Sequence, residues 1–72
     1  MMIVVLYREG DFYRAYSSSA GFVSTCLGIT LTTLGGAMCG FPCAALSGYL
    51  VRLHEAGYGV LIVDGAEVVR YA

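Results

Sequence analysis

The chain is 72 residues long, 58% of them hydrophobic and only 12% charged, with a formal net charge of −1 at pH 7. This length predicts one small domain, residues 1–72, that can bury only about 60% of the surface of its unfolded chain. With no lysine and four arginines, the composition excludes a strongly basic nucleic-acid-binding surface, and the low charge predicts that apolar surface stays exposed.

The N-terminal part of the chain predicts a strand that reaches a glycine-containing corner. Residues 3–7 are apolar, and we expect the strand to continue, or to kink at Gly10, through residue 16. Phe12 and Tyr13 are adjacent aromatics at this corner. Because strand side chains alternate between faces, one of them should pack in the core while the other lies on the surface.

The middle of the chain predicts a short helix followed by two strands. Residues 17–19 are serines, which offer N-cap oxygens for a helix that ends at Gly28. Residues 29–33 and 37–41 are expected to form two strands joined by a hairpin-type connection at residues 34–36.

The clearest helix covers residues 43–56 and should end at Gly57. Apolar side chains recur in it at the i, i+3, i+4 and i+7 spacing that places them on one helical face. This stripe, which we expect to face the core, consists of Leu46, Tyr49, Leu50 and Leu53.

Two further strands are expected to complete the fold. Residues 60–63 form a continuous apolar run, typical of a central strand covered on both faces. Asp64-Gly65 is a turn signal before a last strand at residues 67–71, so the last two strands should form a hairpin. Together the elements predict an α/β (α+β) domain, a small mixed β-sheet of about five strands packed with two or three helices.

A long uncharged segment raises the alternative of a membrane protein. No formal charge lies between Arg14 and Arg52, and a spanning helix needs about 20 mainly apolar residues. Glycines and threonines interrupt this segment, and the alternation at residues 29–32 is typical of a half-buried strand. The N-terminus lacks the basic start and long apolar region of a signal peptide, so we expect no membrane association and a cytoplasmic location.

The residue types offer little support for catalysis or metal binding. Cys26, Cys39 and Cys43 have no Cys-x-x-Cys spacing and are expected to be small buried hydrophobes rather than disulfide or zinc partners. His54 and Glu55 are adjacent on a helix, where neighbours point about 100° apart and cannot form an oriented acid–base pair. We therefore expect no enzyme activity, no metal and no cofactor.

The segment Gly10-Asp11-Phe12-Tyr13 resembles the Gly-Asp-Phe-Tyr-Glu motif of the mismatch-recognition domain of MutS-type DNA mismatch repair proteins. In that family, the aromatic at the position of Phe12 wedges beside a mispaired base, and the glutamate hydrogen-bonds that base. This chain has Arg14 where the family has the glutamate, which replaces a hydrogen-bond acceptor with a donor.

The resemblance extends over roughly residues 3–65. Residues 27–32 are similar to the family's strand of Ile-Ser-Leu-Thr type, and the Met-Cys-Gly-Phe-Pro at residues 38–42 resembles its Met-Ala-Gly-Ile-Pro. Residues 49–53 and 57–64 resemble the helix and the strand that follow. The resemblance implies the fold of the N-terminal domain of MutS (domain I), without the family's connector, lever, clamp and ATPase domains.

The resemblance also implies a DNA-binding module that contacts mismatched or irregular double-stranded DNA through Phe12, with Arg14, Arg8 and Tyr13 as further contacts. Because much of DNA affinity comes from lysines and arginines that release counterions, we expect an isolated monomer to bind weakly. The expected partners therefore include a second copy of the chain or a larger repair protein. The alternative is a protein-interaction or self-assembling module that kept the fold but lost mismatch reading.

Overall fold

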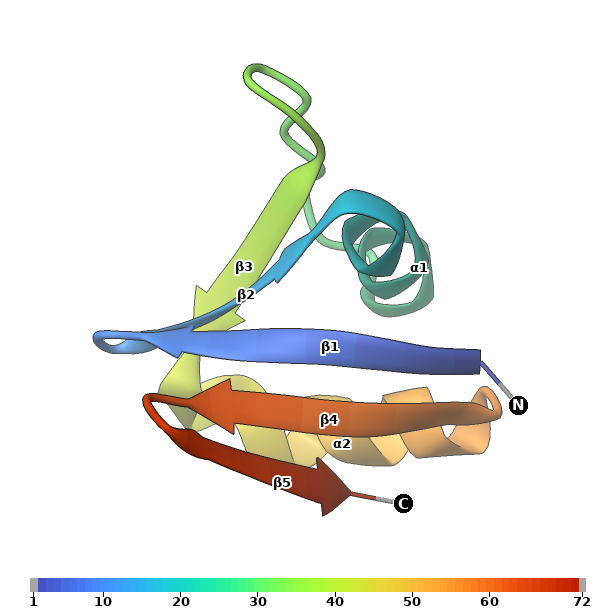
Figure 1. The fold of residues 1–72 in the computed structure, drawn as a ribbon. Coiled ribbons are helices and arrows are strands. Elements are labelled where there is room, and N and C mark those ends of the chain that lie inside the picture. Colours follow the sequence, from blue (N-terminus) through green and yellow to red (C-terminus); the bar gives the residue numbers. More distant parts are fainter. Residues whose placement is uncertain (1, 72) are drawn as a thin grey trace.

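The fold is a five-stranded mixed sheet with two helices, described for residues 2–71 by a computed structural model (Figure 1). The strands lie in the order β3-β2-β1-β4-β5; β1 and β4 run parallel, and the other neighbours are antiparallel. The elements are β1 (Met2–Glu9), β2 (Phe12–Tyr16), α1 (Ser17–Leu27), β3 (Met38–Pro42), a 3₁₀ turn (Cys43–Ala45), α2 (Leu46–Glu55), β4 (Tyr58–Asp64) and β5 (Glu67–Tyr71). The predicted mixed sheet of about five strands is confirmed.

The core lies between one face of the sheet and both helices, because every second strand residue points toward them. Val4 and Leu6 of β1 are fully buried, and Val60 and Ile62 of β4 expose no more than 4% of their surface. Burial of each such side chain stabilises the fold by about 1.5 to 3 kcal/mol. The other buried members of this core are Tyr13, Ala15, Ala20, Val23, Leu27, Cys39, Phe41 and Leu53.

The first two strands form a tight hairpin, not the single kinked strand that the sequence predicted. Glu9 pairs directly with Phe12, so the loop consists of Gly10 and Asp11 alone. Gly10 has φ +63°, a conformation that glycine adopts at little cost and that suits the first position of such a loop. The chain therefore reverses direction at Gly10 instead of bending.

The predicted hairpin at the C-terminal end of the chain is confirmed. Asp64 pairs with Glu67, which leaves Gly65 and Ala66 as a second two-residue loop, and Gly65 has φ +60°. The same glycine-first turn thus reverses the chain twice in this sheet.

Helix α1 lies where the sequence predicted, but its start is stabilised differently. No side chain caps its N-terminus; instead Ser17 N donates to Ala37 O at 3.0 Å, and Ser19 Oγ accepts a hydrogen bond from Val5 N at 3.1 Å. The serine hydroxyl thus ties the helix to β1. At the other end Gly28 has φ +69° and its N–H donates to Ser24 O, which confirms it as the helix terminator.

The strand predicted at residues 29–33 does not form. A single bridge joins Thr32 to Met38, with both backbone hydrogen bonds at 2.8 Å. Near the start of this segment, Ser24 Oγ donates to Ile29 O at 2.5 Å and holds the backbone against α1. Because this side-chain bond competes with sheet pairing, only one residue pair reaches the edge of β3.

The predicted apolar stripe of α2 does face the core. Leu53 is fully buried, and the ring of Tyr49 meets that of Phe41 edge-on, with centroids 4.9 Å apart. Leu46 and Leu50 are half-buried and pack against the same core. Gly57, with φ +90°, follows the helix as predicted.

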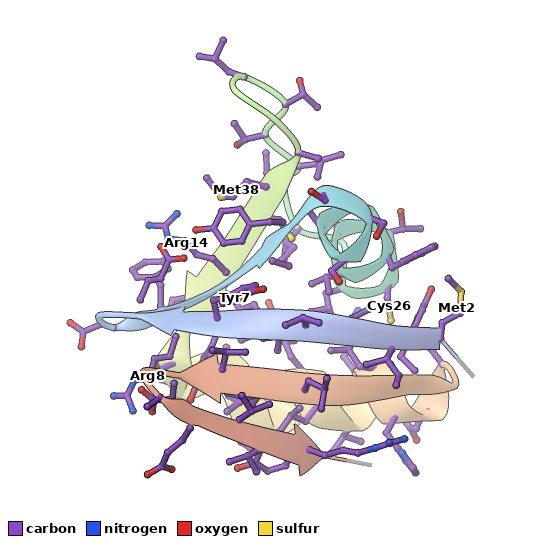
Figure 2. The ribbon with its side chains drawn as sticks, viewed as in Figure 1. Met2, Tyr7, Arg8, Arg14, Cys26 and Met38 are labelled. Carbon is purple, nitrogen blue, oxygen red and sulfur yellow. The ribbon has the colours of Figure 1, made fainter. Side chains whose placement is uncertain are left out.

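The second face of the sheet carries neither helix; we call it the open face. The prediction that residues 60–63 are covered on both sides is wrong, since Leu61 and Val63 point to this face and are only half-buried. The strand residues of the open face are Ile3, Val5, Tyr7, Glu9, Phe12, Arg14, Tyr16, Met38, Gly40, Pro42, Gly59, Leu61, Val63, Val68 and Arg70, some of which are labelled in Figure 2. Within residues 2–71, neither helix is long and apolar enough to span a bilayer.

Candidate nucleic-acid interface

Phe12 occupies an exposed position at the end of the first hairpin. It is the first residue of β2, pairs with Glu9 on one side and Pro42 on the other, and leaves 41% of its surface exposed on the open face. The guanidinium carbon of Arg14 lies 5.6 Å from the centre of its ring. The guanidinium therefore lies over one face of the Phe12 ring in a cation–π contact.

A polar cluster surrounds this aromatic, and the sequence did not predict it. Arg14 Nε lies 3.3 Å from Glu9 Oε1, while Tyr16 Oη donates a hydrogen bond to Glu9 Oε2. Arg14 also reaches Met38, with Nη1 at 3.6 Å from Sδ, and Tyr7 packs edge-on against Tyr16. The Glu9 carboxylate is thus held between two donors next to Phe12.

Tyr13 lies on the opposite side of the sheet from Phe12. Only 8% of its surface is exposed, and its ring packs against Phe41 with centroids 5.9 Å apart. The expected division of the two aromatics between core and surface is therefore confirmed. In this position the ring of Tyr13 packs in the core beneath the first hairpin, so it is not available for stacking on a base.

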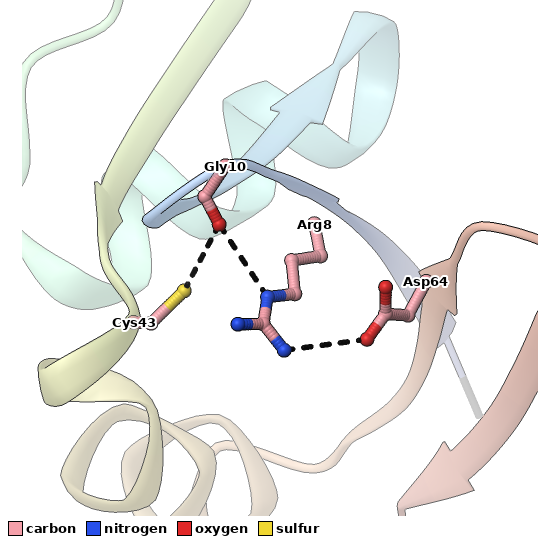
Figure 3. A network of polar contacts seen from close by, with 4 residues as sticks. All are labelled: Arg8, Gly10, Cys43 and Asp64. Carbon is pink, nitrogen blue, oxygen red and sulfur yellow. Dashed lines mark hydrogen bonds and ion pairs between the residues drawn. The ribbon is translucent and has the colours of Figure 1, made fainter.

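Arg8 is also separated from Phe12 and Arg14, because it pairs with Tyr13 and shares its face of the sheet. Its Nη1 forms an ion pair with Asp64 Oδ2 at 3.4 Å, and its Nε donates to Gly10 O at 3.4 Å (Figure 3). The neighbouring carboxylate raises the pKa of the Arg8 guanidinium, which stays charged. Phe12 and Arg14 therefore lie together on the open face, whereas Arg8 lies on the opposite face of the sheet.

The described residues contain no group of three or more histidine, cysteine or carboxylate side chains that could hold a metal ion. All three cysteines are free: Cys39 is buried, whereas Cys26 and Cys43 are half-buried. Burial raises the pKa of the Cys39 thiol, which keeps it protonated and unreactive.

A hollow of about 250 Å³ lies between α2 and the end of β5, away from the polar cluster. It is lined by apolar atoms and offers no convergent charged groups. Its lining residues are Leu50, Val51, His54, Val60 and Tyr71.

Fold and geometry together define a small α/β domain that presents an aromatic side chain at the end of a hairpin, beside an uncovered sheet face. The chain belongs to the MutS domain I family, whose model matches residues 1–71. The predicted resemblance is therefore confirmed.

Curated relatives at high identity carry the name DNA mismatch repair protein MutS. The protein of Thermotoga petrophila is 48% identical over 65 residues, and that of Rickettsia africae is 44% identical over 70 residues. The matched region is 89% of this chain but only 8% of each relative. The chain thus spans a small part of the length of the proteins it resembles.

Proposed function

We propose that the chain is a mismatch-recognition module in DNA repair, which contacts mismatched or irregular double-stranded DNA with Phe12 as an aromatic wedge and has no ATPase or other enzyme activity. The observation that carries this proposal is the 41% exposure of Phe12 next to the loop of the first hairpin, with the guanidinium of Arg14 over its ring. Membership of the MutS domain I family supports it.

The energy of a wedge explains why it would favour defective DNA. Stacking an aromatic on a base contributes roughly 1 to 3 kcal/mol, whereas opening a base step costs a few kcal/mol. These terms nearly cancel on intact DNA. A mismatched or unpaired base is easier to unstack, so the balance turns favourable there.

Electrostatics limit the affinity of a single copy. The net charge is −1, and Arg14 and Arg8 are each paired with a carboxylate and lie on opposite faces of the sheet. We expect a salt dependence no steeper than that for about two phosphate contacts. Tight binding therefore requires a second copy or a larger repair protein to add contacts.

Fluorescence anisotropy with matched and G·T-mismatched duplexes at low salt tests this function. We expect the wild type to prefer the mismatched duplex and Phe12→Ala to lose that preference. Tyr71→Ala is the matched control, because Tyr71 is 43% exposed but lies on β5, away from Phe12. Equal binding of both duplexes by the wild type, or an unchanged preference in Phe12→Ala, would contradict the proposal.

The open face favours a second candidate function, a protein-interaction or self-assembling module. Three large apolar side chains there leave much of their surface exposed: 43% for Ile3, 39% for Tyr7 and 63% for Val68. Exposed apolar surface of this kind is typical of an interaction site. Sedimentation equilibrium of wild type and Val68→Lys distinguishes the two candidates. Concentration-dependent dimers that Val68→Lys abolishes, without mismatch preference in the anisotropy assay, would favour self-assembly.

A further inference from the structure

Strand β5 lies at one edge of the sheet, and among residues 2–71 its single strand partner is β4 (Figure 1). All five of its residues are exposed. The opposite edge is partly covered, because Thr32 exchanges two backbone hydrogen bonds of 2.8 Å with Met38 of β3. An edge strand is a template for pairing with another chain, which proteins often prevent with a proline or a bulge. β5 has neither, and its sequence, Glu-Val-Val-Arg-Tyr, favours an extended strand.

The two-residue loop before β5 decides which of its backbone groups point outward. Asp64 and Glu67 flank this loop and exchange backbone hydrogen bonds across it, and hydrogen-bonded and non-hydrogen-bonded pairs then alternate along β4 and β5. Residues 67, 69 and 71 therefore direct their backbone groups toward β4, whereas residues 68 and 70 direct theirs away from it. The edge thus presents a donor and an acceptor at every second residue, the spacing that an antiparallel strand matches.

A second copy of β5 matches this edge best in one register. When two copies run antiparallel around a two-fold axis at Val69, Val68 of each copy pairs with Arg70 of the other, and about four backbone hydrogen bonds form. A register centred on Val68 or on Arg70 would form only about two such bonds within the strands. Centring on Arg70 would also place two arginines directly opposite each other, which is unfavourable. The register at Val69 places neither Glu67 nor Arg70 opposite its own copy.

The side chains on the helix side of β5 favour the same arrangement. Val69 and Tyr71 pair with the buried Ile62 and Val60, so they point to that side, yet 42% and 43% of their surface is exposed. Val51 of α2 is 56% exposed and, with Tyr71, lines the apolar hollow beside them. At the two-fold axis, the two Val69 side chains form a non-hydrogen-bonded pair, in which side chains approach most closely, and each Tyr71 lies diagonal to the Val69 of the other copy. Pairing of the strands therefore buries apolar surface that a single copy leaves in water.

We propose that β5 is a homodimerisation edge, through which two copies of the chain pair around Val69 and join their five-stranded sheets into one continuous sheet. This interface differs from a stacking of open faces, and it does not depend on DNA binding. It leaves Phe12 uncovered, because β1 and β4 separate β2 from β5. A dimer would thus carry two copies of Phe12 and Arg14, which links assembly to the affinity that a single copy lacks.

Sedimentation equilibrium at concentrations up to about 1 mM tests this inference, since interfaces below about 1,200 Å² form transient complexes. We expect the wild type to be in a monomer–dimer equilibrium. Val69→Lys should raise the dimer Kd at least about tenfold, because two lysines would face each other at the axis. Ile3→Lys is the matched control: Ile3 is 43% exposed but lies on β1 in the open face, so its variant should keep the wild-type Kd. Thermal melts report whether both variants are folded.

Cysteine cross-linking tests the register itself. In Val69→Cys the two thiols lie in a non-hydrogen-bonded pair with Cα atoms about 4.5 Å apart, a distance that allows a disulfide. In Glu67→Cys the same register separates the two residues by about 13 Å along the strands. Mild oxidation with diamide should therefore cross-link Val69→Cys, whereas Glu67→Cys should stay at the background that Cys26 and Cys43 set in the wild type.

Three results would overturn the proposal. The first is a wild type that stays monomeric over the whole concentration range. The second is a dimer that Ile3→Lys weakens and Val69→Lys does not, which would indicate association through the open face. The third is cross-linking of Val69→Cys no greater than that of Glu67→Cys. None of these results bears on mismatch preference, which the anisotropy assay measures separately.

Discussion

The two hairpins of this sheet use the same turn but differ in their surroundings. Gly10 and Gly65 each occupy the first position of a two-residue loop, with φ +63° and +60°. The first loop is braced from outside the hairpin: Asp11 O accepts a hydrogen bond from Cys43 N at 2.8 Å, at the start of the 3₁₀ turn before α2. In the second hairpin, all five residues of β5 are exposed at the edge of the sheet.

The comparison indicates that a glycine at the first loop position is enough to form a hairpin. Contacts from other elements are needed to hold the backbone of that hairpin in place. Phe12 follows the braced loop and lies between two paired neighbours, β1 and β3. Val68 lies on an edge strand with a single partner, β4. A wedge loses less entropy on binding when its backbone is already fixed, so the first hairpin is the better place for one.

Substitutions at Tyr13, which is buried in the first hairpin, and at Val68, which is exposed in the second, should differ most in their effect on the free energy of unfolding. Tyr13→Ala should lower the free energy of unfolding by about 3 kcal/mol, because it leaves a cavity against Phe41. Val68→Ala, at a side chain 63% exposed, should change it by less than about 0.5 kcal/mol. Urea denaturation followed by circular dichroism measures both, and similar losses would show that the hairpins are equally packed.

A smaller effect is expected from the glycines of the two turns. An alanine at Gly10 or Gly65 would meet no atom within 4 Å, so its cost is conformational, about 1 to 2 kcal/mol. Gly10→Ala should cost more than Gly65→Ala, since the first loop cannot relax without disturbing the Asp11–Cys43 bond. Thermal unfolding compares them.

Gly21 provides the control for these substitutions. It lies inside α1 without a positive φ, and an added Cβ would also meet open space. Gly21→Ala should therefore stabilise the protein by roughly 0.5 to 1 kcal/mol. Equal destabilisation at all three glycines would refute a conformational origin of the effect.

The smallest expected effect is a titration in the first hairpin. The hydrogen bond to Glu9 raises the pKa of the Tyr16 hydroxyl above its usual value of 10.0. Because the pKa is raised in the folded state, the stabilisation from this bond is fully present below pH 10 and is lost as pH rises through the raised pKa. Absorbance titration of wild type against Tyr16→Phe isolates this hydroxyl, and Glu9→Ala should return its midpoint toward 10. An unchanged midpoint in Glu9→Ala would exclude the carboxylate as the cause.

Most elements could be predicted from the sequence because their apolar pattern is strong, as in the one-sided stripe of α2 and the continuous apolar run of β4. The first hairpin was not predicted, although the sequence carries a signal for it: glycine at the first loop position is typical of a II′ turn. The predicted strand at residues 29–33 failed for a different reason. Its alternation is real, but the bond from Ser24 to Ile29 O directs the backbone toward α1.

The positions of the apolar side chains, the glycines that allow the chain to reverse and the opposite orientation of Phe12 and Tyr13 all follow from the amino-acid order. Three contacts depend on how the strands pair and pack: Glu9 lies beside Phe12, Arg8 lies on the opposite face of the sheet from Arg14, and Ser19 binds β1. The physical reason is that strand register sets cross-strand neighbours, and a change of one residue in loop length moves every following side chain to the other face. That choice depends on packing against elements far along the chain, such as the start of α2.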